Sequence, residues 1–278
     1  MRELRRARPL LGTIVDIRID DKGHGNEAID AAFTAVAQVH EMMSFQSLES
    51  DLSRLNRQAT TGSVTVHPLL GKVLRAALHL AQVSKGVFDP TLGAQTVKRG
   101  LAPAPSRLLP DPNADWRDVL VGENDTIAFA RPLWLDLSGI AKGFAVDQAV
   151  AAMRALGITS GVVNAGGDLR AFGVRVEAVS LRSARRRDRA SGAVEICDAA
   201  LAASGGRAAR RGGWRAISPL VAPTGDRLAG LRRSVAVRAP DCITADGLTK
   251  VVLFAPDMAR DLLAQAGAQA WIDEGRPQ

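Results

Sequence analysis

Apolar positions recur along the chain with two different periods. Alternation of apolar and polar residues predicts a strand over residues 12–19, because successive side chains of a strand point to opposite faces. Three- and four-residue spacing predicts helices over residues 26–45, 68–84, 141–157, 245–254 and 258–266, and a short polar helix is expected around 50–56. Further strands are expected at 134–137, 161–164, 169–172 and 234–239, and a proline-rich loop follows position 90. Strands and helices interleave without regular βαβ spacing, which favours an α+β fold.

One residue interrupts the apolar stripe of the helix predicted over 141–157. The stripe is formed by Val146, Val150, Met153 and Leu156, and its extension back by four residues falls on Lys142. A lysine in a first helical turn opposes the positive end of the helix dipole and loses hydration if it faces the core. Lys142 therefore either extends its ammonium out past the helix end or binds a phosphate or carboxylate group.

Composition excludes several classes of protein. The 278 residues carry a net charge of +7, but the arginines are scattered, tyrosine is absent and only 4% of residues are aromatic, which argues against nucleic-acid binding. All four histidines lie in the first third of the chain, which argues against a Ser-His-Asp hydrolase. Lysine occurs at only six positions, whereas arginine is common. This bias indicates that lysine itself is needed at Lys142 and Lys250.

Cysteine content and the first twenty residues bear on the compartment. Cys197 and Cys242 have neither a zinc-site spacing nor a disulfide framework, and both are expected to be small core residues. The first twenty residues hold no uninterrupted apolar export segment and no cysteine for lipid attachment. The chain as given is expected in the cytoplasm, or in the periplasm if an export signal has been removed.

Two loops have the composition of ligand-binding segments. In the segment 164–168 the paired glycines Gly166 and Gly167 permit positive φ and let a ligand approach backbone amides, although a tight hairpin turn has the same pattern. The segment 88–91, Phe-Asp-Pro-Thr, is either a turn that ends a helix or an aromatic wall with an acidic hydrogen-bond acceptor. Both interpretations stay open for each loop.

A third cluster lies in the segment 244–250. In a helix opened by Thr244, residues Asp246, Thr249 and Lys250 share one face. A carboxylate and a hydroxyl that converge suit Mg²⁺, which binds oxygen ligands and substrate phosphates. The alternative is that Asp246 stabilises the helix start and pairs with Lys250.

Together these segments resemble the ApbE family, the FAD:protein FMN transferases, nearly from end to end. The matching segments are 9–13, 43–45 with 52–56, 86–91, 136–147, 163–168, 203–205 and 234–250. The resemblance implies one flavin transferase domain over residues 1–278, with an α+β fold of two close-packed lobes, mixed sheets and flanking helices. It also implies Mg²⁺-dependent transfer of FMN from FAD to a threonine or serine hydroxyl of a target protein, with release of AMP.

The resemblance further implies which residues form the site. The residues expected to contact FAD are Leu11, Phe45, Val87, Phe88, Asp89, Asp136, Lys142 and, through its backbone, Leu220. The metal would be held by the backbone carbonyl of Gly139 and the side chains of Asp246 and Thr249. The resemblance identifies no catalytic base, and Asp168 is a conceivable proton acceptor. FAD would be the substrate, Mg²⁺ the cofactor and a protein the acceptor, with no nucleic acid and no membrane segment.

The chain departs from the family pattern at several positions, one of which is the pair Gly206 and Arg207, where an acidic and an aromatic residue are usual. Ser218 and Val221 stand where a histidine and an aspartate are usual, and Lys250 stands where a threonine usually follows the metal-binding aspartate by four residues. These departures make flavin binding a firmer expectation than full activity. Two rival classes remain, a non-catalytic FAD-binding protein and an FAD pyrophosphatase that produces AMP and free FMN.

Overall fold

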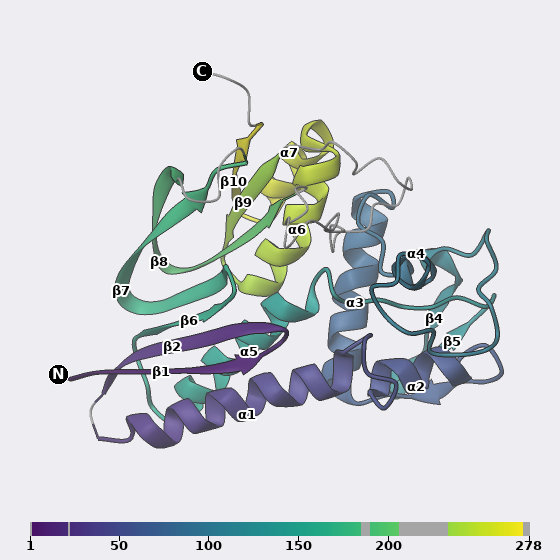
Figure 1. Ribbon diagram of the computed structural model, residues 1–278, viewed down its shortest axis with the longest axis horizontal. Coiled ribbons are helices and arrows are strands. Elements are labelled where there is room, and N and C mark those ends of the chain that lie inside the picture. Colours follow the sequence, from purple (N-terminus) through teal and green to yellow (C-terminus); the bar gives the residue numbers. More distant parts are fainter. Residues whose placement is uncertain (1, 22, 185–189, 206–232, 275–278) are drawn as a thin grey trace, which may run out of the picture. The chain divides into compact units, whose positions relative to one another are not determined.

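The computed structural model describes residues 2–21, 23–184, 190–205 and 233–274, which divide into two compact units (Figure 1). The first unit takes its described residues from 1–40, 140–207 and 232–278, and the second takes them from 41–139. Each unit combines helices with antiparallel strands, so the α+β class is confirmed. A single domain over residues 1–278 stays a prediction.

The first unit is built on a seven-stranded sheet with the order β1-β2-β6-β7-β8-β9-β10. Its strands are β1 (Arg2–Leu10), β2 (Thr13–Asp21), β6 (Gly161–Ala165), β7 (Asp168–Arg182), β8 (Ala190–Gly205), β9 (Ser234–Ala239) and β10 (Gln269–Asp273). Every neighbouring pair is antiparallel, so the expectation of a mixed sheet is wrong here. The reason is local for β1–β2 and β6–β7, where a two-residue turn reverses the chain.

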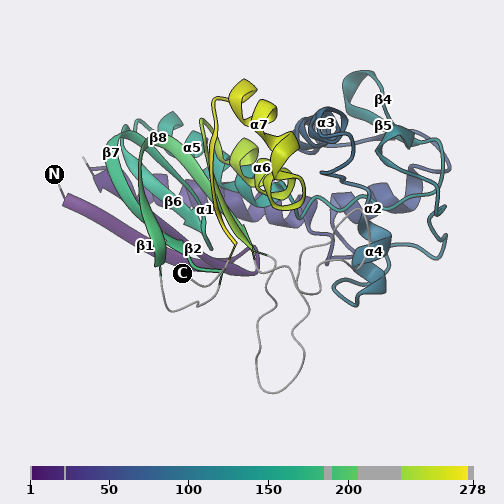
Figure 2. The same ribbon diagram turned by 90° about the horizontal axis from the view of Figure 1, so that it is seen from above.

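Helices pack on this sheet (Figure 2). The helices with residues in the first unit are α1 (Gly25–Met43, up to residue 40), α5 (Ala141–Ala155), α6 (Cys242–Phe254) and α7 (Pro256–Gln265). Helix α5 packs on β6 and β7, and α6 packs on β8, β9 and α5. The predicted stripe on α5 is confirmed at Val146, Val150 and Met153, whereas Leu156 lies past the helix end and is 39% exposed.

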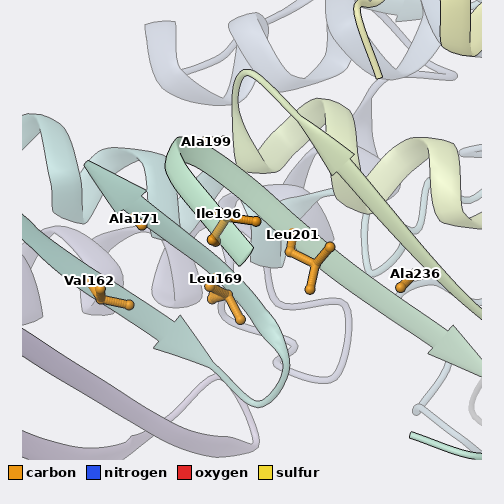
Figure 3. Close-up of a cluster of buried hydrophobic side chains, with 7 residues drawn as sticks. All are labelled: Val162, Leu169, Ala171, Ile196, Ala199, Leu201 and Ala236. Carbon is orange, nitrogen blue, oxygen red and sulfur yellow. The ribbon is translucent and has the colours of Figure 1, made fainter. Parts of the chain in front are cut away.

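An apolar cluster joins the central strands of the sheet (Figure 3). It comprises Val162, Leu169, Ala171, Ile196, Ala199, Leu201 and Ala236, from β6, β7, β8 and β9. Val179 and Leu181 extend it along β7 well beyond the predicted strand of 169–172. The prediction stopped too early because Gly173 has a φ of +76°, and the β7–β8 register shifts between Ala171 and Val176.

The described residues of the second unit form three helices and a small sheet, besides the end of α1. Its elements are α2 (Asp51–Gln58), β3 (Val64–Thr65), α3 (Pro68–Val83), α4 (Gly93–Lys98), β4 (Val119–Val121) and β5 (Thr126–Phe129), with 3₁₀ turns at Trp116–Asp118 and Glu123–Asp125. The sheet order is β3-β5-β4, and both pairings are antiparallel. Helix α2 begins after Ser50, whose hydroxyl accepts the Ser53 N–H at 3.1 Å, and α3 begins with Pro68 in its first turn.

The strand predicted at 134–137 is wrong. Trp134 forms only an isolated parallel bridge with Leu92, and the next residue pairs with a side chain instead of a strand. The Asn56 amide donates to the Leu135 carbonyl at 2.9 Å and accepts the Leu135 N–H at 2.8 Å. An asparagine side chain offers the same donor and acceptor as a backbone peptide, so this apolar run satisfies its polar groups without a ladder.

The strand β1 and the environment of Cys197 also differ from expectation. Sequence analysis did not predict β1, whose arginine-rich segment pairs with β2 along its length. Arginine in β1 is stabilised by acids nearby, as in the Arg5 bond to Asp16 at 2.8 Å. Cys242 is buried as expected, but Cys197 is exposed, and both are free thiols.

Candidate functional site

Lys142 lies in the first turn of α5 and pairs with a buried carboxylate. Its ammonium forms an ion pair with Asp168, the first residue of β7, whose side chain is only 1% exposed. The second Asp168 oxygen accepts the Ala203 N–H at 3.3 Å. The Lys142 side chain remains 33% exposed, so part of it faces solvent. The expected anionic partner therefore exists, and it is a residue of the protein itself.

The charges around Lys142 shift two pKa values. Burial disfavours its charged form, but the carboxylates of Asp168 and then Asp246 outweigh burial and hold the pKa of Lys142 above its ordinary value. Burial, followed by repulsion from Asp246, raises the pKa of Asp168, although Lys142 and Lys250 oppose this rise. Lys142 is thus a permanent cation beside two carboxylates.

A glycine hairpin places Asp168. Ala165 pairs with Asp168 across the two-residue loop, and Gly166 and Gly167 have φ values of +67° and +111°. The Asn164 side chain accepts the Gly167 N–H at 2.9 Å, which closes the loop. The hairpin interpretation of this segment is therefore confirmed. Any Cβ at Gly166 would lie 2.4 Å from the Thr13 hydroxyl, so the β1–β2 hairpin lies against this loop.

Leu11 occupies the neighbouring hairpin loop in an unusual conformation. Its φ is +56°, and Gly12 follows with a φ of +68°, between the paired residues Leu10 and Thr13. A leucine in the left-handed region costs free energy, because its Cβ crowds the following carbonyl. Leu11, a predicted flavin residue, is therefore held in a strained conformation at the sheet end that also carries Gly166.

Asp246 is buried in the second turn of α6. The helix begins at Cys242 after Asp241, whose carboxylate accepts the Thr244 N–H at 2.9 Å, so the expected start at Thr244 is wrong. The Asp246 side chain is 2% exposed, and its Oδ2 accepts the Gly143 N–H of α5 at 3.0 Å. Its Oδ1 pairs with the Lys250 ammonium, which also donates to the Asp246 carbonyl at 2.9 Å. The alternative interpretation is thus correct in pairing Asp246 with Lys250, but Asp241 and not Asp246 caps the helix start.

Thr249 shares this face, as the helical period predicts, and is fully buried. Its hydroxyl donates to the Asp246 carbonyl at 2.7 Å and lies 2.8 Å from the hydroxyl of Ser204 on β8. Both oxygens of Asp246 and the hydroxyl of Thr249 thus already have partners.

Asp147 connects α5 to the start of α6, and sequence reasoning missed it. Its carboxylate accepts the N–H groups of Cys242 at 3.0 Å and Ile243 at 2.8 Å, and it binds Arg170 at 2.6 Å. Burial raises the pKa of Asp147, although these bonds oppose the rise. No local pattern marks this role, because the backbone partners are about a hundred residues later in the chain.

The donor set does not fit a divalent cation as it is arranged. Mg²⁺ needs free oxygen ligands in octahedral geometry, whereas an ammonium already occupies the carboxylate of Asp246. Within the described part of the chain, no three His, Cys, Asp or Glu side chains form a metal-binding group. Gly139, the third predicted ligand, belongs to the second unit. The magnesium site over Gly139, Asp246 and Thr249 stays a prediction from the resemblance.

The second unit brings the other predicted flavin residues close together in its loops. Asp89 accepts two hydrogen bonds from Thr91, from the N–H at 2.8 Å and from the hydroxyl at 2.6 Å. The next residue, Pro90, accepts the Asp136 N–H at 2.7 Å, and the Asp136 carboxylate accepts the Thr96 hydroxyl at 2.7 Å. The segment 88–91 is therefore hydrogen-bonded to Asp136, which follows Pro90 by 46 residues in the chain.

The apolar residues of this group are largely shielded from solvent. Phe88 and Phe45 are buried, and Val87 is half-buried. A Cβ at Gly93 would lie 3.0 Å from the Phe45 ring, so this ring packs against the start of α4. Leu220, like the departures at Ser218 and Val221, lies outside the described residues.

These features define an α+β protein with two units, each of which carries part of the predicted site. The first unit holds a cluster of two lysines and two aspartates, and the second holds the segment 88–91 beside Asp136. Comparison with known proteins identifies the family. The sequence model of the ApbE family matches residues 11–272, and the chain belongs to this family.

The curated relatives that match this chain share the name FAD:protein FMN transferase. The FAD:protein FMN transferase of Treponema pallidum is 33% identical over 204 residues, which cover 67% of this chain and 56% of the relative. The FAD:protein FMN transferase of Haemophilus influenzae is 29% identical over 233 residues, which cover 76% of this chain and 67% of the relative. The chain thus spans little more than half the length of the Treponema relative.

Solved structures show the same fold. The apo form of the flavinyl transferase ApbE from Pseudomonas stutzeri matches with a TM-score of 0.81 at 21% identity, over 100% of this chain and 92% of that one. The ApbE protein of Thermotoga maritima matches with a TM-score of 0.80 at 21% identity, over 98% of this chain and 94% of that one. The ApbE-like fold predicted from the sequence is confirmed.

Proposed function

We propose that this protein transfers FMN from FAD to a threonine or serine hydroxyl of an acceptor protein and releases AMP. The observation that carries the proposal is the Lys142 ammonium, which two carboxylates keep charged at the start of α5 while a third of its side chain stays exposed. A diphosphate bound there would meet a fixed positive charge. The names of the relatives supply the flavin substrate.

The reaction exchanges one phosphorus–oxygen bond for another. The acceptor hydroxyl oxygen bonds to the phosphorus of the FMN portion, and the bond from that phosphorus to the bridging oxygen of AMP breaks. AMP leaves with the bridging oxygen and its electron pair, and the hydroxyl proton passes to a base. Lys142 would stabilise the charge that develops on the phosphate oxygens. Asp168 is the candidate base, because its carboxylate lies beside Lys142, the residue proposed to bind the phosphate oxygens.

The resemblance implies a magnesium cofactor. The hydrogen bonds and the ion pair of Asp246 argue against one, because they occupy both of its carboxylate oxygens. In the family pattern Gly139, Asp246 and Thr249 would hold Mg²⁺, which would supply positive charge to the phosphate groups. Here the oxygens of Asp246 are bonded to Gly143 and Lys250. The proposed transfer therefore rests on FAD and the protein acceptor alone, and the magnesium requirement stays a prediction to be measured.

The deciding experiment follows flavin onto a protein. The purified chain is incubated with FAD and a candidate acceptor, with and without Mg²⁺, and flavin fluorescence is read on a denaturing gel while AMP is measured by chromatography. A fluorescent acceptor band with an equal amount of AMP is the expected result. An acceptor variant with alanine in place of the target hydroxyl residue is the control and should stay dark.

Two other outcomes would identify the rival classes. AMP and free FMN without a fluorescent band would make the protein an FAD pyrophosphatase. Bound FAD that is neither split nor transferred would make it a non-catalytic FAD-binding protein, a class that would tolerate the altered positions Ser218, Val221 and Lys250.

The proposed transfer also implies the partners of the protein. The proposed partners are FAD and an acceptor protein, with no nucleic acid. Among the described residues, no helix combines the length and apolar character that crossing a bilayer requires. The cytoplasmic location stays a prediction.

A further inference from the structure

Two buried carboxylates of the first unit are matched by two lysines. Asp168 and Asp246 are close enough for their charges to repel, and both have side chains at most 2% exposed. Two such carboxylates need a cation nearby, because an unpaired charge loses its hydration on burial. Lys142 pairs with Asp168, and Lys250 pairs with Asp246. The cluster thus already contains the positive charge that a divalent cation would bring.

Lys250 holds Asp246 at two points. Its ammonium pairs with Oδ1 and donates to the backbone carbonyl of the same residue at 2.9 Å. An ammonium has three N–H donors, so these two bonds leave one at Lys250, and the one hydrogen bond of Lys142 to the described residues leaves two. The Lys250 side chain is 12% exposed, and that of Lys142 is 33% exposed. Both ammonium groups can therefore donate to a phosphate oxygen while they keep their carboxylate partners.

The other oxygens of this face are also occupied. Gly143 of α5 donates to Asp246 Oδ2, and the Thr249 hydroxyl bonds to the Asp246 carbonyl and to Ser204. A divalent cation would have to displace Lys250 before it could reach the carboxylate. The displaced ammonium would then lie beside a doubly charged ion, which is an unfavourable contact.

We infer that the Lys250 ammonium takes the place of a divalent cation on Asp246, so that this protein binds the diphosphate of its nucleotide through Lys142 and Lys250 without metal. The inference rests on the proposed function for the identity of the nucleotide. Lys250 would thus determine that nucleotide binding does not depend on Mg²⁺. The positive charge that neutralises the diphosphate would come from the protein itself.

The test measures FAD affinity in EDTA and in excess Mg²⁺ by the quenching of flavin fluorescence. The wild-type dissociation constants in the two buffers should differ by less than threefold. Lys250→Thr should bind FAD about tenfold more weakly in EDTA, because it loses a charge-assisted hydrogen bond. Mg²⁺ should restore at least threefold of that loss, since the variant frees Asp246 Oδ1 and adds a hydroxyl.

Two further variants control the result. Lys98→Thr removes the same charge from an exposed residue of the second unit, and its FAD affinity should stay within threefold of wild type. Asp246→Asn with Lys250→Met removes both buried charges, so it keeps the test valid if Lys250→Thr leaves Asp246 unpaired and fails to fold. This double variant should bind FAD about tenfold more weakly in EDTA, with no recovery in Mg²⁺.

The outcomes separate this inference from the proposed function. Wild-type affinity that rises threefold or more with Mg²⁺ would overturn the inference and leave the proposed function standing. The same holds if the folded Lys250 variants bind FAD in EDTA within threefold of wild type, or if Mg²⁺ restores less than threefold in a folded Lys250→Thr. No FAD binding by the wild type in either buffer would overturn both.

Discussion

Asp89 shows how burial and hydrogen bonding compete at one residue. Burial raises the pKa of its carboxyl above the ordinary 3.8, although the two hydrogen bonds from Thr91 oppose the rise. A carboxyl with a raised pKa holds its proton more tightly in the folded state than in the unfolded state. Ionised Asp89 therefore lowers stability, and this cost grows as the pH rises from 3.8 through the raised pKa.

Asp89→Asn should remove that cost. The asparagine carbonyl can still accept both bonds from Thr91, and it does not ionise. Relative to wild type, the variant should become more stable as the pH rises above 3.8, by at most about 1 kcal/mol because the residue is only half-buried. Urea unfolding at a series of pH values measures this difference. Asp257→Asn, at a side chain that is 95% exposed, is the control for the same substitution at the surface. A flat difference between Asp89→Asn and wild type would contradict the assignment.

At the scale of elements, the contact between α5 and α6 depends on a glycine. A Cβ at Gly143 would lie 2.2 Å from the Cys242 carbonyl oxygen and 2.7 Å from the Asp246 Cβ. The same residue donates its N–H to Asp246, so the close approach and the hydrogen bond depend on one another. Neither neighbour is the far end of a flexible side chain, and the helices would have to move apart to admit a methyl group.

Gly143→Ala should therefore destabilise the protein by about 1–3 kcal/mol, despite the higher helix propensity of alanine. Gly71→Ala is a matched control, because Gly71 is also helical but its Cβ would meet only the Asp125 side chain, at 2.2 Å from Oδ1. That side chain can move at little cost, since its partner Arg75 is half exposed. Thermal unfolding of both variants is the measurement. Equal losses would show that the α5–α6 approach is not limiting.

The type of an element could be predicted where apolar residues keep the helical period over many residues. The helix at α5 was predicted to begin at its observed first residue, and the stripe from Val146 to Met153 is buried. The apolar run at 134–137 was wrongly predicted to be a strand. Its backbone is hydrogen-bonded to the Asn56 side chain, and the spacing of apolar residues does not reveal such a bond. Strand β7 was predicted too short because its register shift depends on the pairing with β8.

For the whole molecule, ligand binding and stability are linked. Any nucleotide that binds only the folded state raises the free energy of unfolding by mass action, about 2.7 kcal/mol at a ligand concentration one hundred times the dissociation constant. For a chain of 278 residues this amounts to roughly 5 °C in Tm. FAD in EDTA should produce this shift.

Riboflavin is the matched ligand for that measurement. It keeps the flavin ring but lacks the diphosphate that Lys142 and Lys250 would bind, so at equal concentration its shift in Tm should be smaller by several degrees. Differential scanning fluorimetry of the full chain at a wavelength away from flavin emission would record both. Equal shifts would show that the two lysines take no part in nucleotide binding.

The sequence by itself determined the described helices other than the short α4, the family and the residues that share one face of α6, because the helical period is a local property that side-chain spacing displays. The tertiary structure decided which charges meet. Lys142 pairs with Asp168, 26 residues later, because a glycine hairpin starts β7 there, and Asp246 accepts the N–H of Gly143 across 103 residues because α5 packs on α6. Ion pairs depend on distance in space and on burial, so only the packed strands and helices could show that Lys250 already occupies the carboxylate expected to bind a metal.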